Sequence, residues 1–118
     1  MKFSSDAFVV GKDAPVVPVG DGIERQVLGY TDALMVIRVR FAEGAEGYVH
    51  AHPHAQVSYV ESGEFQVLID GERKLLAKGD SFCVQPNLYH GAVCRKAGVL
   101  LEVFSPVRED FLGQEESS

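Results

Sequence analysis

The chain has 118 residues, of which 46% are hydrophobic and 24% charged, and its formal net charge is −6. This length predicts one globular domain with a single core, and no run approaches the roughly 20 apolar residues of a membrane-spanning helix. The negative charge argues against nucleic acid or a membrane as a partner, because nucleic acids and anionic membranes bind basic surfaces. It leaves room for a small anionic substrate held by a few local arginines.

The cysteines and the N-terminus add expectations about the protein's environment. Cys83 and Cys94 do not form a CxxC unit, so we expect two reduced thiols rather than a zinc knuckle or a redox pair. The first residues lack the apolar segment of a secretion signal. We therefore expect a cytoplasmic protein.

Residues 1–22 are expected to form an irregular arm, because prolines and glycines interrupt them. Phe8 and several valines in this arm are too apolar for a free tail. We expect them either to pack on the domain or to add a strand to a neighbouring subunit. A homodimer is the assembly that we expect.

From residue 23 onward the sequence predicts strand after strand. Residues 34–41 alternate, so that Met35, Ile37, Val39 and Phe41 share one face. About nine short strands are predicted, over residues 25–29, 34–41, 48–52, 56–61, 64–69, 72–77, 81–85, 90–95 and 99–104. This density of strands indicates an all-β antiparallel sandwich or barrel, a single domain over residues 23–112.

Glycines mark the turns between these strands. The pair Asp70-Gly71 is a strong hairpin signal. Residues 62–63 and 97–98 are predicted to be turns that end one strand and begin the next. We expect one helical turn at residues 108–112 and a frayed tail at residues 113–118.

Three of the four histidines lie between residues 50 and 54, and the fourth is His90. Side chains two apart on an extended strand project from the same face, so His50 and His52 are expected side by side. Two neutral imidazoles make half of a metal site, and His90 can supply a third. His54 follows Pro53 at the strand break, and we expect it to point away from the cluster.

These histidines lie in two segments that resemble the paired motifs of the cupin superfamily. The segments are His50-x-His52-xxx-Gln56-…-Gly63 and Gly79-Asp80-…-Pro86-xxx-His90. The resemblance covers nearly all of residues 23–108 and implies the cupin fold, an antiparallel double-stranded β-helix or jelly-roll barrel.

Within the cupins, the chain resembles the small pectin-degradation cupins that linearise unsaturated uronate monomers from pectin and alginate. Those proteins have a C-terminal strand that runs acid-x-Phe-Ser-Pro-x-Arg-Glu-Asp-Phe. Here the same pattern runs from Glu102 through Phe104 and Arg108 to Phe111. The family acid is aspartate, so Glu102 places its carboxyl one methylene farther from the backbone.

The resemblance implies that His50, His52, Gln56 and His90 hold one divalent metal ion. The first motif usually ends in glutamate, whereas Gln56 is a neutral amide. Three imidazoles and an amide leave the ion its full charge of +2, which favours holding an anion and polarising a carbonyl or hydroxyl. This favours Lewis-acid chemistry over dioxygen chemistry and leaves the metal open among Ni, Zn, Fe, Mn and Co.

Glu102 lies between Leu100 and Phe104 on one face of the strand at residues 99–104. A glutamate there either faces solvent or lies in a polar cavity, because burying a carboxylate without a partner is costly. The resemblance implies the cavity, with Glu102 as general acid/base and a pKa raised by burial. A salt-bridged structural glutamate is the alternative.

Other candidate site residues also have two interpretations each. Phe104 is either part of the core or, as the resemblance implies, a cavity wall that positions the substrate. Arg108, past the strand end, is either a two-pronged clamp for a carboxylate or the partner of a neighbouring acid. Arg38 and Arg40 share one strand face, which is either the cavity or a solvent or subunit face.

Two functions follow from this pattern. The first is an enzyme that opens and tautomerises a cyclic unsaturated uronate to a linear keto acid, with Glu102 moving a proton and Arg108 holding the carboxylate. The alternative is a non-catalytic cupin that binds a metal and a small ligand, or a metal-dependent dioxygenase acting on another small organic compound.

Overall fold

The computed structural model describes residues 3–113. Its elements in chain order are η1 (Gly11–Asp13), β1 (Val17–Gly20), β2 (Ile23–Tyr30), β3 (Met35–Phe41), β4 (Glu46–His50), β5 (Ala55–Ile69), β6 (Glu72–Ala77), β7 (Ser81–Val84), β8 (His90–Ser105) and α1 (Glu109–Leu112). The tail expected to fray lies, apart from Gly113, outside the described residues. Across the described part of the chain, no helix has the length and apolar character that a membrane crossing needs.

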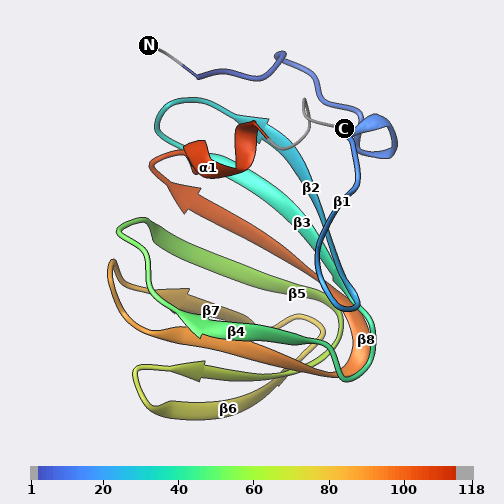
Figure 1. Cartoon of the computed structure of the whole chain (residues 1–118), viewed down its shortest axis with the longest axis vertical. Helices are drawn as coiled ribbons and strands as arrows, with labels where there is room; N and C mark the ends of the chain where they lie inside the picture. The colour runs from blue at the N-terminus through green and yellow to red at the C-terminus, as the bar shows by residue number, and fades with distance from the viewer. Residues whose placement is uncertain (1–2, 114–118) are drawn as a thin grey trace.

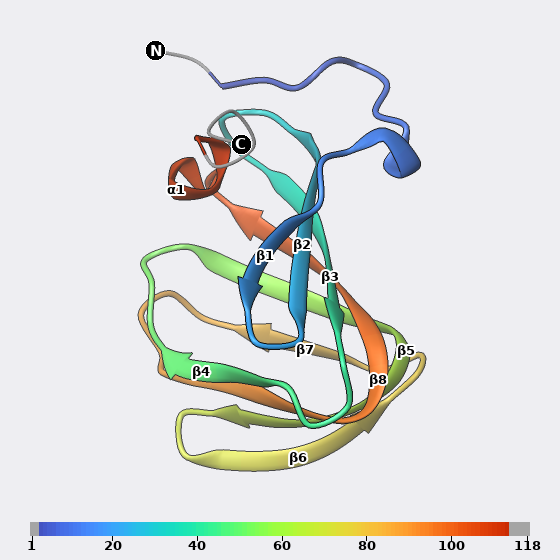
Figure 2. The ribbon, with the colours of Figure 1, turned by 45° about the vertical axis from the view of Figure 1, so that its right-hand side comes forward.

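Every strand pair is antiparallel, which confirms the predicted all-β antiparallel fold. The hydrogen-bonded order is β1-β2-β3-β8-β5-β6, with β4 pairing β8 and β7 pairing β5. Figures 1 and 2 show two layers, one containing β1, β2 and β3 and the other containing β4 and β6. The double-sheet arrangement is consistent with the expected jelly roll, but the described strands form an open sheet rather than a hydrogen-bonded closed barrel.

The long strands β5 and β8 connect the two layers, and here the sequence prediction was wrong. Residues 62–63 and 97–98 were predicted to be turns between separate strands, yet β5 and β8 run through them without a break. Gly63 has a φ of 81°, and a Cβ at Gly98 would lie 2.1 Å from the Ser62 carbonyl oxygen. Glycine is needed at this corner because the backbones approach closely, not because the chain reverses.

The Asp-Gly hairpin was predicted correctly. Asp70 and Gly71 have φ values of 48° and 84°, and Ile69 pairs with Glu72 across them. Two consecutive left-handed residues form the tight turn whose twist matches the flanking strands. This turn sets the register between β5 and β6.

Part of the N-terminal arm packs on its own domain. Strand β1 pairs with β2, and the Gln26 side-chain amide donates hydrogen bonds of 3.0 Å to the carbonyls of Gly11 and Ala14. Phe8, in contrast, is 90% exposed. The arm therefore forms the outer edge of one sheet and still presents apolar surface.

The core lies between the layers, near the corner where β5 and β8 pass from one layer to the other. Met35, Ile37, Val39 and Phe41 are all buried, which confirms the predicted alternation of β3. The ring of Phe41 meets that of Phe65 edge to face, with 5.1 Å between centroids. Core side chains of β3, namely Ile37, Val39 and Phe41, also line the space that remains between the layers.

Candidate functional site

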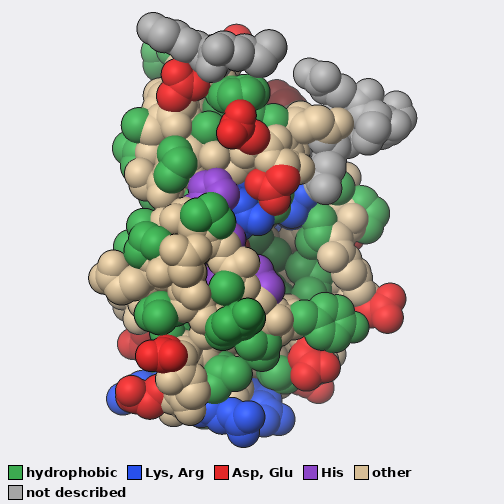
Figure 3. Space-filling view, turned by 60° about the vertical axis from the view of Figure 1, so that its left-hand side comes forward, with side chains coloured by type: hydrophobic (Ala, Val, Ile, Leu, Met, Phe, Trp, Pro, Cys, Tyr) green, Lys and Arg blue, Asp and Glu red, His purple; other side chains and the backbone are tan. Residues whose placement is uncertain are grey.

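A cavity of about 290 Å³ opens between the layers, near the small end of the range for ligand sites. Its walls are largely apolar, and its polar groups come from β2, β4, β5, β8 and the segment that follows β8. They are Arg25, His50, Gln56, His90, Glu102 and Arg108. Figure 3 faces this open end, where histidine and basic side chains meet around a hollow.

Three histidines converge at one end of the cavity. His50 ends β4, His90 begins β8 and the two are paired across these strands, while His52 lies just past the end of β4. Potential ligand atoms of the three rings all lie within 4.8 Å of one another. His52 and His90 are buried, at 8% and 4% exposure.

Each ring in this cluster is oriented by the backbone. The Nδ1 atoms of His50, His52 and His90 lie 2.7, 3.0 and 2.9 Å from backbone carbonyl oxygens. A carbonyl only accepts hydrogen bonds, so Nδ1 carries the proton, and in a neutral ring Nε2 then presents a lone pair. Burial lowers the pKa of both His52 and His90, which favours the neutral form that binds metals.

The Nε2 lone pairs of His52 and His90 face no hydrogen-bond donor among residues 3–113, and a bound cation would pair with them. His90 Nε2 is buried without a hydrogen-bond partner. His52 Nε2 lies 3.0 Å from Gln56 Oε1. Because Nδ1 of His52 holds the ring proton, both of these atoms are hydrogen-bond acceptors, and neither can donate to the other. The residues therefore fit a divalent ion.

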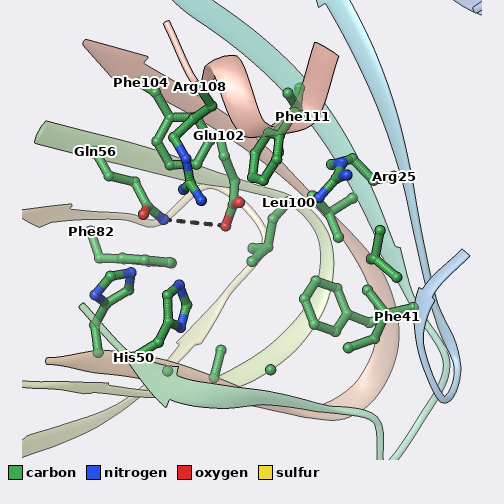
Figure 4. A pocket seen from close by; sticks show the side chains of 18 residues that line it. Arg25, Phe41, His50, Gln56, Phe82, Leu100, Glu102, Phe104, Arg108 and Phe111 are labelled. Carbon is green, nitrogen blue, oxygen red and sulfur yellow. Dashed lines mark hydrogen bonds between the residues drawn. The ribbon is translucent and has the colours of Figure 1, made fainter. Parts of the chain in front are cut away.

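Gln56 links the histidine cluster to Glu102. Its amide nitrogen donates to Ser58 Oγ at 3.0 Å and to Glu102 Oε2 at 3.3 Å, so its oxygen points to His52. Figure 4 draws the bond from Gln56 to Glu102 as a dashed line. The amide thus bridges the histidine cluster and the carboxyl group.

Glu102 lies in the cavity, not on the outer surface. Burial raises its pKa to about 7, against the opposing effects of a hydrogen bond from Ser58 and the charges of Arg108 and Arg25. A carboxyl group that titrates near neutrality can both accept and release a proton at physiological pH.

Phe104 has both of the characters weighed from the sequence. It is 2% exposed and belongs to the core cluster, and it also lines the cavity. Its ring meets that of His52 edge to face, with 5.7 Å between centroids. The aromatic wall therefore contacts the histidine cluster directly.

Arg108 combines the two interpretations that the sequence left open. It donates from Nε and Nη2 to the two carboxylate oxygens of Asp110, at 3.0 and 2.8 Å, and these bonds lower the pKa of Asp110. It also lines the cavity, and its side chain is 11% exposed. Its guanidinium carbon lies 4.1 Å from the centroid of the Phe111 ring.

Sequence reasoning missed Arg25. It is 7% exposed and lines the cavity beside Glu102, and its guanidinium carbon lies 3.8 Å from the centroid of the Phe111 ring. One signal was available, because Arg25 falls on the same face of β2 as Ile23 and Val27, which are buried. An arginine in phase with core residues indicates a polar interior.

Arg38 and Arg40 lie on the outer face of β3, opposite its buried residues. Arg38 Nε is 4.0 Å from a carboxylate oxygen of Glu61. Of the two positions weighed for these arginines, the outer face is the one observed. His54 is half-buried, and it is not among the three histidines whose ring nitrogens converge.

The chain is similar to known proteins along most of its length. The family model described as "Cupin domain" matches residues 37–104. A pectin degradation protein, KdgF, from Dickeya dadantii (strain 3937) is 41% identical over 107 residues, which cover 89% of this chain and 97% of that protein.

Two crystal structures are similar along nearly their whole length. An RmlC-like cupin from Shewanella frigidimarina NCIMB 400 is 51% identical with a TM-score of 0.89, covering 92% of this chain and 97% of that chain. KdgF from a Halomonas species is 34% identical with a TM-score of 0.85, covering 90% and 98%.

Proposed function

This chain belongs to the cupin family, and from that premise we propose that it converts cyclic unsaturated monouronates from pectin or alginate into linear keto acids. The similarity to a pectin degradation protein supports a uronate as substrate, because pectin is built from uronate units. Glu102 carries the proposal, since a carboxyl group with a pKa of about 7 shares a cavity with His50, His90 and two arginines.

We propose His50, His52, Gln56 and His90 as the ligands of one divalent ion. The convergence of the three imidazoles and the position of Gln56 Oε1 beside His52 support this set. An ion bound there would supply Lewis-acid polarisation of a substrate oxygen. Ni, Zn, Fe, Mn and Co are all compatible with imidazole ligands.

Glu102 is proposed to move the proton that the isomerisation requires. Its carboxylate takes the proton of the anomeric hydroxyl as the bond from the anomeric carbon to the ring oxygen breaks, which leaves an aldehyde and an enolate. The resulting carboxylic acid then protonates the alkene carbon remote from the former ring oxygen, and the enolate becomes a ketone. No atom or electron is gained or lost, and Glu102 returns to its starting state.

Arg108 and Phe104 are proposed to hold the substrate. The Arg108 guanidinium lies at the cavity and can bind a carboxylate through the nitrogen hydrogens that Asp110 leaves open. Phe104 forms an apolar wall against which a sugar ring can pack. Together they would orient the anomeric hydroxyl toward Glu102.

The test is loss of the ultraviolet absorbance of the ring alkene when metal-loaded protein is mixed with unsaturated monouronates. We expect the wild-type protein to remove this absorbance and Glu102→Gln to slow the reaction by about 10²–10⁴-fold, since it removes a general acid/base. Glu61→Gln is the matched control, because Glu61 is exposed on the outer face.

Both variants should keep the wild-type metal content. Unchanged absorbance with wild-type protein under every candidate metal would contradict the proposal, as would full activity of Glu102→Gln. Oxygen uptake by an iron-loaded sample would instead favour a dioxygenase.

We further propose that the N-terminal arm contributes to a homodimer. Phe8, Val10 and Val16 are 90%, 55% and 54% exposed, and a second copy would bury this apolar surface. Sedimentation of the wild-type protein should show a dimer. The double variant Phe8→Ser/Val10→Ser should show a weaker dimer. A wild-type monomer at micromolar concentration would contradict the assignment.

A further inference from the structure

Arg25 occupies a position that normally belongs to the core. The side chains of β2 alternate so that Ile23, Arg25 and Val27 all face inward, and each is 7–8% exposed. Burying a guanidinium is costly unless polar or aromatic groups surround it, so an arginine at this position needs a local reason. Its position on the cavity wall, in the electrostatic field of Glu102, supplies that reason.

Phe111 lies between the two guanidinium groups of the cavity. The guanidinium carbon of Arg25 is 3.8 Å from the ring centroid and that of Arg108 is 4.1 Å from it. Figure 4 shows the ring between the two arginines, with the Glu102 carboxyl beside them. Because each ring face is electronegative, one ring can stabilise a cation on each side while keeping the two cations apart.

Arg108 alone is poorly placed to hold a substrate carboxylate. Its Nε and Nη2 edge already makes a two-pronged pair with Asp110. Nη1 and one hydrogen of Nη2 remain for a ligand. A carboxylate inside the cavity would therefore gain from a second cation on the cavity wall.

We propose that Arg25 is a substrate-binding residue, which together with Arg108 forms a two-arginine clamp for the carboxylate of a sugar acid. The assignment rests on the proposed function for the identity of the ligand as a uronate. It adds β2, a strand outside both cupin motifs, to the residues that select the substrate. The selected feature is the carboxylate, since a neutral sugar offers nothing to either guanidinium.

The test measures binding of glucuronate, a saturated uronate without the ring alkene, to metal-loaded protein by titration calorimetry. We expect Arg25→Met to weaken binding by about 10- to 100-fold, because it removes charge-assisted hydrogen bonds while keeping most of the side-chain volume. Arg25→Lys should recover part of the affinity. Arg40→Met, an exposed arginine on the outer face of the neighbouring strand, should bind glucuronate as the wild type does.

Metal content and thermal unfolding separate a binding role from a structural one. Arg25→Met is expected to keep the metal and, with unsaturated monouronate, to raise KM by a similar factor while kcat changes by less than about 5-fold. Unchanged glucuronate affinity in folded Arg25→Met, or loss of the metal, would overturn the assignment. If Arg25→Met does not fold, Arg25→Lys decides, and wild-type affinity in that variant overturns the assignment.

The two proposals fail in different ways. Wild-type protein that binds glucuronate through Arg25 but leaves unsaturated monouronates unchanged would refute the proposed reaction and keep the clamp. Wild-type turnover with an unaltered KM in Arg25→Met would keep the reaction and refute the clamp.

Discussion

The histidine end of the cavity and its arginine end are held in place by different contacts. At the histidine end, each Nδ1 of His50, His52 and His90 meets the carbonyl of a residue two positions away in the chain. At the arginine end, Arg25 and Arg108 come from segments more than 80 residues apart and meet on the ring of Phe111. Local backbone therefore orients the first group of side chains, and side-chain contacts orient the second.

This difference predicts how each end responds to substitution. A ring held by its own backbone keeps its orientation when a distant side chain changes. A guanidinium held by Phe111 and Asp110 changes position or pairing when either partner changes. Substitutions at the histidine end should therefore act by loss of a ligand, and those at the arginine end by graded changes in anion affinity.

Of the two ends, the histidine end is expected to show the larger effect. His90→Ala removes an imidazole whose Nε2 is buried among the other rings, so we expect loss of the metal and a fall in uronate turnover of about 10³-fold. His54→Ala is the matched control from the same stretch, and elemental analysis should find its metal retained. Equal metal loss in both variants would show that the ligand histidines have been assigned incorrectly.

Glu102 lies between the two ends, and its titration should affect stability. Its folded pKa is about 7 against an ordinary value of 4.5, so between these pH values the folded state binds more protons than the unfolded state, and stability falls as pH rises. Glu102→Gln cannot ionise. We compare the two proteins after a chelator has removed the metal. From pH 4.5 to pH 8, the free energy of unfolding of Glu102→Gln should rise by roughly 2–3 kcal/mol relative to that of the wild type.

Denaturant unfolding at several pH values measures this difference. Glu61→Gln, on the outer face, serves as the control and should show little change across the window. A difference between Glu102→Gln and wild type that does not vary with pH would mean that Glu102 titrates in its ordinary range.

A smaller effect is expected at the arginine end from Phe111→Leu. The change removes the ring that both guanidinium groups contact, and each cation–π contact contributes about 0.5–1 kcal/mol or more. We expect glucuronate affinity to fall by about 5- to 10-fold while metal content stays at the wild-type level. Loss of metal would instead mean that the two ends of the cavity depend on each other.

The smallest effect is expected from Asp110→Asn. The substitution removes the charge that pairs with Arg108, and because Asp110 is largely exposed the pair contributes little to stability. Releasing the Nε and Nη2 edge should lower KM for unsaturated monouronate by about 2- to 5-fold, with kcat nearly constant. Weaker binding would show that Asp110 orients Arg108 for the substrate rather than competing with it.

Much of the histidine end could be predicted from the sequence, because His50 and His52 are neighbours and His90 lies in a recognisable second motif. His50 and His52 were expected side by side, with His90 as a possible third imidazole, and the three rings converge. His52 nevertheless lies just past the end of β4, and its ring is oriented by a carbonyl acceptor, not by strand alternation. The convergence was predictable, whereas the tautomer that each ring adopts required the backbone coordinates.

The course of the long strands could not be predicted from the sequence. Gly63 and Gly98 are residues typical of turns, and only the pairing of β5 with β8 shows that they permit close backbone contact. The prediction of separate strands there was wrong because a glycine's conformational freedom does not reveal which use the fold makes of it.

The sequence by itself determined the all-β pattern, the cupin motifs, the histidine cluster and the face shared by Leu100, Glu102 and Phe104. These are properties of residue type and spacing along the chain. Only the tertiary structure decided that Arg25 joins the cavity, that Arg38 and Arg40 do not, and that Phe111 lies between two guanidinium groups. The physical reason is that the register between β2, β3 and β8 sets these contacts, and register depends on the packing of the whole domain.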